Sequence, residues 1–161
     1  MKYLFSILII AQAFVLSAQS NSSTEDLKPI YGKWEGSLTY IDYQSGKPYT
    51  MKANLEVTEK RVGYLLLLKN SYPSEASANN TDKFKLSKSG KKINGHKIVS
   101  KSFNNGELKI ITEYKGKDDR KKGIIRYTYS ITSNTFSIEK TVRFEGETDW
   151  ITRNIYSYTK S

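Results

Sequence analysis

The sequence predicts an all-β protein, built as one antiparallel up-and-down barrel of about 8–10 strands. Apolar and polar residues alternate with a period of two along most of the chain, and turn residues interrupt this alternation about every 8–12 residues. After residue 20, no segment shows helical periodicity. A meander of this many strands would leave two exposed edges, so we expect the sheet to close on itself.

Residues 1–19 have the features of an export signal peptide. Lys2 supplies the positive start, residues 4–16 form an apolar core, and Ser17-Ala18-Gln19 offers small residues for cleavage. The apolar core is shorter than the roughly 20 residues that cross a membrane, which disfavours the alternative of an uncleaved anchor. We therefore expect cleavage after residue 19, no membrane span in the mature form, and a secreted or periplasmic location.

The composition of the rest of the chain suits one exported bacterial domain. Without Lys2, 25 basic residues remain against 16 acidic ones, and the chain contains no cysteine. Disulfides and a lipid-modified cysteine are thereby excluded, which fits a bacterial exported protein better than an animal one. We divide the chain into a polar leader, residues 20–30, and a single barrel domain, residues 31–161, expected to be a monomer.

The first three strands are predicted from their alternation. Residues 31–43 place Trp34 and Tyr40 on one face, and residues 51–58 have cleanly separated apolar and polar faces. Residues 62–69 are apolar on both faces, so we expect the leader or the following loop to cover their outer side.

The later strands are separated by turn signals. They are predicted at residues 83–87, 96–103, 107–115, 124–132, 135–144 and 149–159. Asn104-Asn105-Gly106, Ser133-Asn134 and the region of Gly146 are the expected hairpin turns.

Gly32-Lys33-Trp34, at the start of the first strand, resembles the Gly-x-Trp signature of the lipocalins and their calycin relatives. The resemblance, to a small secreted bacterial barrel of this type, implies that Trp34 plugs the closed end of the barrel. It also implies that an arginine from the last strands stacks on Trp34, with Arg153 as the best match and Arg143 as the second. The Arg-x-Tyr pair of fatty-acid-binding proteins is absent, so a fatty acid is not implied as the ligand.

Catalytic and metal-binding constellations are not evident in the sequence. His96 is the only histidine and lies beside a turn, where a surface or capping role is expected. Glu145, Glu147 and Asp149 surround Gly146, but a solvated hairpin turn explains them better than a calcium site does. We expect no enzyme activity, no cofactor and no metal.

Two basic stretches, residues 88–97 and 115–122, could meet a polyanion. Lysines at hairpin tips also keep β proteins soluble, and this explanation is favoured here. Export argues against nucleic acid as a partner, which leaves an anionic component of the cell envelope as the alternative.

Tyrosine-rich strands suggest a ligand pocket, because aromatic walls that carry hydroxyls suit a lipid-like or aromatic molecule. Lys140 lies on an otherwise apolar face, so it either reaches a carboxylate or an anionic ligand, or marks a bulge. The predicted pocket residues are Tyr40, Met51, Leu55, Leu66, Tyr127, Tyr129, Phe136, Ile138 and Tyr156, with Lys140 as the cationic contact.

The favoured function is that of an exported protein that binds a small apolar or amphipathic ligand inside a lipocalin-like barrel. The alternative is an interaction module of the cell envelope that uses the barrel exterior and the basic loops and has no ligand cavity. An outer-membrane barrel is disfavoured because the chain ends in polar residues. The presence of a cavity distinguishes the first two.

Overall fold

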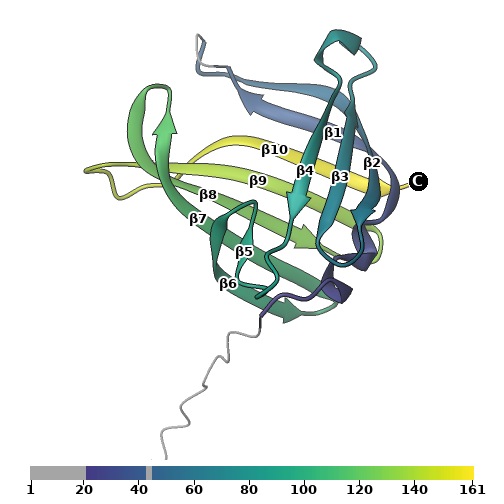
Figure 1. Cartoon of the computed structure of the whole chain (residues 1–161). Helices are drawn as coiled ribbons and strands as arrows, with labels where there is room; N and C mark the ends of the chain where they lie inside the picture. The colour runs from purple at the N-terminus through teal and green to yellow at the C-terminus, as the bar shows by residue number, and fades with distance from the viewer. Residues whose placement is uncertain (1–20, 43–44) are drawn as a thin grey trace, which may run out of the picture.

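The computed structural model describes residues 21–42 and 45–161; the predicted export signal lies outside these ranges. Within them, ten strands form one antiparallel sheet in the order β4-β3-β2-β1-β10-β9-β8-β7-β6-β5, which curls into a nearly closed barrel (Figure 1). The predicted fold class is confirmed. The strands are β1 (Gly32–Ile41), β2 (Pro48–Arg61), β3 (Leu65–Ser71), β4 (Asn80–Lys85), β5 (Lys92–Ile93), β6 (His96–Asn104), β7 (Glu107–Asp118), β8 (Lys121–Ile131), β9 (Thr135–Phe144) and β10 (Ile151–Lys160).

The register follows the predicted alternation. β1 pairs with β2 and also with β10, so the first and last strands of the barrel lie side by side. The β6–β7 hairpin turns at Asn105 and Gly106, whose φ angles are 50° and 79°. Two successive positive φ angles are typical of the tight hairpin turn that this Asn-Gly pair predicts.

Closure between β4 and β5 is limited to one end of the barrel. Leu86 forms an isolated antiparallel bridge with Ile93, and the side-chain oxygen of Asn94 accepts a hydrogen bond from the Lys85 amide at 2.7 Å. Among the described strands, β4 is hydrogen-bonded along its length only to β3. The edge of β4 is therefore unpaired over most of its length, and this break in the hydrogen-bonded wall is here called the lateral opening.

The leader closes one end of the barrel. Residues Glu25–Ile30 form a short 3-10 helix, η1, whose Leu27 and Ile30 side chains are buried in the core. The Ser22 amide donates to the Gly90 carbonyl at 3.0 Å, and Lys101 Nζ lies 2.7 Å from the Asp26 carboxylate. The packed domain therefore begins before residue 31, the predicted boundary. Among the described residues, no helix has the length and apolar character to span a membrane.

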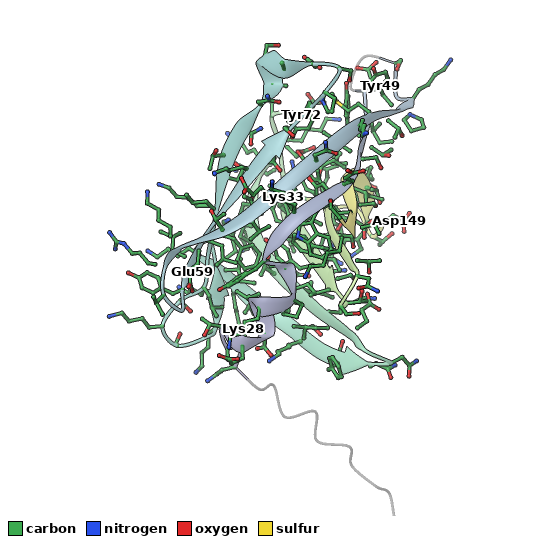
Figure 2. The ribbon with its side chains drawn as sticks, turned by 90° about the vertical axis from the view of Figure 1, so that its right-hand side faces the viewer. Lys28, Lys33, Tyr49, Glu59, Tyr72 and Asp149 are labelled. Carbon is green, nitrogen blue, oxygen red and sulfur yellow. The ribbon has the colours of Figure 1, made fainter. Side chains whose placement is uncertain are left out.

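The two ends of the barrel differ in character. The end next to η1, here called the floor, is packed with apolar side chains, and Lys28 of η1 lies at this end (Figure 2). Tyr49 and Tyr72 lie toward the opposite end, the mouth (Figure 2). A second 3-10 helix, η2 (Ala76–Ala78), connects β3 to β4. On β3, Leu66 and Leu68 are buried inside, whereas Leu65 and Leu67 are half-buried on the outer face.

Candidate functional site: the floor and cavity of the barrel

Trp34 fills the floor of the barrel, as its predicted role requires. It is 1% exposed, and its indole Nε1 donates a hydrogen bond to the Ile30 carbonyl at 2.8 Å. Its ring packs against Phe136, with the ring centroids 6.1 Å apart. The bond to Ile30 fastens η1 to the first strand.

The cation over Trp34 is Lys160, and the prediction of Arg153 at this position is wrong. Lys160 Nζ lies 5.2 Å from the centroid of the indole ring and donates to the Pro29 carbonyl at 3.0 Å. Lys160 faces Trp34 directly in the β1–β10 register. A lysine opposite the tryptophan thus supplies the cation–π contact that was expected from an arginine.

The two glycines around Trp34 have different roles. Gly32 adopts a φ of 107°, which disfavours any residue with a side chain. At Gly36, a Cβ atom would lie 2.0 Å from the Ser157 carbonyl oxygen. Gly36, after the tryptophan, is therefore the glycine that lets the backbones of β1 and β10 approach each other.

Arg153 joins a buried charge cluster with Asp118 and Lys140. Arg153 stands at a bulge in β10, and its Nε lies 2.7 Å from Asp118 Oδ2, while Lys140 Nζ lies 2.7 Å from Asp118 Oδ1. The Asp118 side chain is only 3% exposed. Burial alone would raise the pKa of this carboxyl, but the two cations hold it below its ordinary value. Lys140 thus has a carboxylate partner, which is one of the alternatives that its place on an apolar face predicts.

A cavity of about 320 Å³ lies within the barrel. It borders the free edge of β4 and the first residues of β6, so it reaches the lateral opening in the barrel wall. Its walls come from six strands and from the turn between β5 and β6. The lining residues are Leu68, Asp82, Lys83, Phe84, Asn94, His96, Tyr127, Tyr129, Ile138, Asn154 and Tyr156.

Tyrosine rings form much of the cavity wall. Tyr127 and Tyr129 stack with their centroids 6.3 Å apart, and Phe84 meets Tyr129 edge to face at 5.1 Å. The hydroxyls of Tyr72 and Tyr156 lie 3.0 Å apart, within hydrogen-bond distance. Burial raises the pKa of Tyr127, Tyr129 and Tyr156 above the ordinary value, so these side chains are neutral phenols at neutral pH.

His96 and Asp82 are the cavity residues that sequence reasoning missed most clearly. His96 is not a simple surface residue, because its ring stacks on Tyr114 with centroids 3.7 Å apart, and burial lowers its pKa. Asp82 precedes the predicted start of the fourth strand, at residue 83. Extending the alternation two residues back from the buried Phe84 would have placed Asp82 on the inner face.

Four of the ten predicted pocket residues line the cavity: Tyr127, Tyr129, Ile138 and Tyr156. Leu55, Leu66 and Phe136 instead pack in the apolar core with Met51 and Tyr40, and Lys140 pairs with Asp118. The lining residues that were not predicted are Leu68, Asp82, Lys83, Phe84, Asn94, His96 and Asn154.

No metal site is evident in the described ranges, where no three His, Asp or Glu side chains gather closely enough to hold an ion. The residues that line the cavity carry aromatic rings, two aliphatic chains, amides, one carboxylate, one imidazole and one lysine amine. This set can hold a small organic molecule by stacking and hydrogen bonds.

Three solved structures resemble this chain at low sequence identity. Rv2717c from M. tuberculosis matches with a TM-score of 0.57 and 10% identity, over 85% of this chain and 96% of that protein. A mutant of the fluorescent protein UnaG matches with a TM-score of 0.41 and 13% identity, over 84% of this chain and 98% of that one. A protein of unknown function from the DUF3598 family of Nostoc punctiforme matches with a TM-score of 0.36 and 10% identity, over 83% of this chain and 48% of that one. Of these three, the first supports the barrel architecture.

No family model matches the chain, and no curated protein matches it either.

Proposed function

We propose that this protein is an exported binding protein that holds a small apolar or amphipathic molecule in the cavity of its barrel. The observation that carries the proposal is the tyrosine-lined space of about 320 Å³, which reaches the lateral opening beside β4. Aromatic walls with a few convergent polar groups are typical of ligand pockets. A barrel that acts only through its exterior has no need of such a space.

The volume limits the size of the ligand. Ligand pockets usually measure about 300–1,000 Å³, so this cavity of about 320 Å³ is at the small end. A compact molecule with one ring system fits this space better than a long-chain lipid does.

The proposal includes location and assembly. The sequence features of residues 1–19 support export, and we propose that the mature protein acts outside the cytoplasm as a monomer. We propose binding, and no catalytic step, as its activity. The alternative, an interaction module of the envelope, becomes the better explanation if no ligand enters the cavity.

The direct test is to purify the protein from its own host and look for a retained molecule. Native mass spectrometry followed by solvent extraction should show a small organic compound bound to the folded chain. For the emptied protein, quenching of intrinsic fluorescence by a panel of small aromatics, lipids and porphyrins should reveal which members bind.

A matched pair of variants locates the binding. Ile138 lines the cavity, whereas Ile155, on the neighbouring strand β10, has the opposite, outward orientation. Ile138→Phe should therefore abolish binding by filling the space, and Ile155→Phe should leave it unchanged. Equal binding by both variants would show that the ligand sits elsewhere and would overturn the proposal.

A further inference from the structure

Asp82 presents a carboxylate at the rim of the cavity. In the β3–β4 register, Leu66 faces Phe84 and Leu68 faces Asp82. Leu66, Leu68 and Phe84 are buried inside the barrel, so Asp82, two residues before Phe84, is on the same inner face. It is nevertheless exposed, because β4 borders the lateral opening.

A buried amide holds this carboxylate in place. Asn70 is 7% exposed, and its Nδ2 donates to Asn80 Oδ1 at 2.8 Å and to Asp82 Oδ2 at 3.0 Å. Among the described residues, no lysine or arginine forms an ion pair with Asp82. The second oxygen of an oriented and unneutralised carboxylate is thus available to a donor on a ligand.

The other ionisable groups near the cavity do not cancel this charge. Lys83 also borders the cavity, but it is exposed, and the alternation along β4 places its side chain on the face opposite to Asp82. His96 has a pKa lowered by burial, so it is uncharged at neutral pH. Lys140 and Arg153 share Asp118 and do not line the cavity, although together with Asp118 they keep one net positive charge nearby.

The tyrosine rings of the cavity wall can contact both an aromatic ring and a cationic group of a ligand. Neutral aromatic rings line the cavity beside Asp82, at Tyr127, Tyr129 and Tyr156. Burial is the main cause of the raised pKa of Tyr127 and Tyr156, and the negative charge of Asp82 makes a smaller contribution. Aromatic faces attract both flat rings and ammonium groups.

We infer that the cavity takes a small aromatic amine, with its ring between the tyrosine walls and its ammonium group on Asp82. This inference rests on the proposed binding function and names its ligand class. It differs from the sequence-based expectation that Lys140 would contact an anionic ligand.

The test compares three probes with the same ring and different end groups: phenethylamine, hydrocinnamate and phenethyl alcohol. Calorimetric titration of the full mature protein should show that the amine binds most tightly. A hydrogen bond to a charged group contributes about 1.5–3 kcal/mol, so Asp82→Asn should weaken amine binding about tenfold to hundredfold and change alcohol binding little. Glu35, exposed on the outward face of β1, provides the control Glu35→Gln, which removes the same charge and should have no effect.

Charge reversal separates a recognition role from a folding defect. Asp82→Lys should exclude the amine and improve hydrocinnamate binding, a gain that an unfolded protein cannot give. If the wild-type protein prefers hydrocinnamate, or if Asp82→Asn binds the amine as well as the wild type, the inference is wrong. Binding of any probe that Ile138→Phe abolishes would still support the cavity as a binding site, whereas no binding by any probe, together with an empty extract, would overturn both proposals.

Discussion

Lys160 lies directly opposite Trp34 across the β1–β10 ladder, with its Nζ 5.2 Å from the centroid of the indole ring. The same amine donates to the Pro29 carbonyl, and the indole donates to the Ile30 carbonyl. The first strand, the last strand and η1 are therefore joined at one point of the floor. η1 and β1 are neighbours in sequence, whereas β10 is far from both, so these contacts join the last strand to the first and close the floor of the barrel.

Trp34→Ala should destabilise the protein by about 3–5 kcal/mol, as large aromatic truncations in cores do. Urea unfolding monitored by circular dichroism measures this loss. Lys160→Met keeps most of the packing of the lysine stem and removes the cation, so at this exposed position it should cost about 0.5–1 kcal/mol. An unchanged unfolding midpoint for Trp34→Ala would mean that the floor does not support the fold.

Gly36→Ala should destabilise the barrel because the new Cβ would lie 2.0 Å from the Ser157 carbonyl oxygen. The contact is to backbone, so β1 and β10 must move apart, and overpacking of this kind costs about 1–3 kcal/mol. Ser37→Ala, at the next position and facing outward, is the control and should be nearly neutral. Equal stability of the two variants would show that the strands have room to separate.

Asp118→Asn should destabilise the protein by about 3–5 kcal/mol, because Lys140 and Arg153 lose the carboxylate they share in a buried position. The pKa of Asp118 is lowered from its ordinary value of 3.8 on folding. The stability that it contributes is therefore complete above that value and is lost as the pH falls through the lower, folded-state pKa. Acid unfolding curves should show a smaller pH dependence in this variant below about pH 4.

Asp119→Asn is the matched control for the charge cluster. Asp119 is exposed in the adjacent turn and has a φ of 46°, which asparagine tolerates well. Its stability and its acid unfolding should match those of the wild type. A comparable loss in this control would point to the turn, and not to the buried cluster, as the source of the effect.

The strand pattern was predictable from the sequence because each strand of a half-buried sheet has its own local alternation. Most predicted strand ends lie within a few residues of the observed ones, and the Asn105-Gly106 turn was recognisable from its residue types. β5, with two residues, was too short to show any period. The sequence places Leu27 and Ile30 in a polar leader, because two apolar residues in a polar segment give no periodic signal.

The site was less predictable than the fold because it depends on register between distant strands. The bulge at Arg153 shifts the pairing of β10 with β9, and alternation along β10 alone does not reveal it. Placing Lys160 opposite Trp34 requires the β1–β10 register, and placing Arg153 beside Asp118 requires knowledge of this bulge. Alternation along β8 and β10 predicts the cavity tyrosines of these strands, whereas Asp82 lies before the predicted start of the fourth strand and is therefore not predicted.

The export signal leads to a prediction at the N-terminus. The mature protein should begin near Ser20 and appear in the periplasm or the medium, because residues 1–19 have the charge, apolar core and small residues of a cleaved signal. N-terminal sequencing of protein from its own host measures this directly. Recovery of a chain that begins at Met1 from the membrane fraction would contradict the proposed location.

Alkaline titration should separate the cavity tyrosines from the surface ones. Burial, with smaller contributions from Tyr72 and Asp82, raises the pKa of Tyr156, whereas the bond from Arg61 lowers the pKa of the surface residue Tyr64. The phenolate absorbance of the folded protein should therefore rise in two phases, one near or below the ordinary value of 10 and one well above it.

A phenol whose pKa is raised on folding stabilises the protein below its unfolded-state pKa, and this contribution is lost as the pH rises through the folded-state value. The second absorbance phase should accordingly coincide with loss of the near-ultraviolet circular dichroism signal. Tyr156→Phe should reduce the amplitude of the second absorbance phase, whereas Tyr64→Phe should reduce the amplitude of the first phase only. A single phase near pH 10, with the fold intact, would show that the cavity phenols are open to water and would contradict the enclosed tyrosine wall.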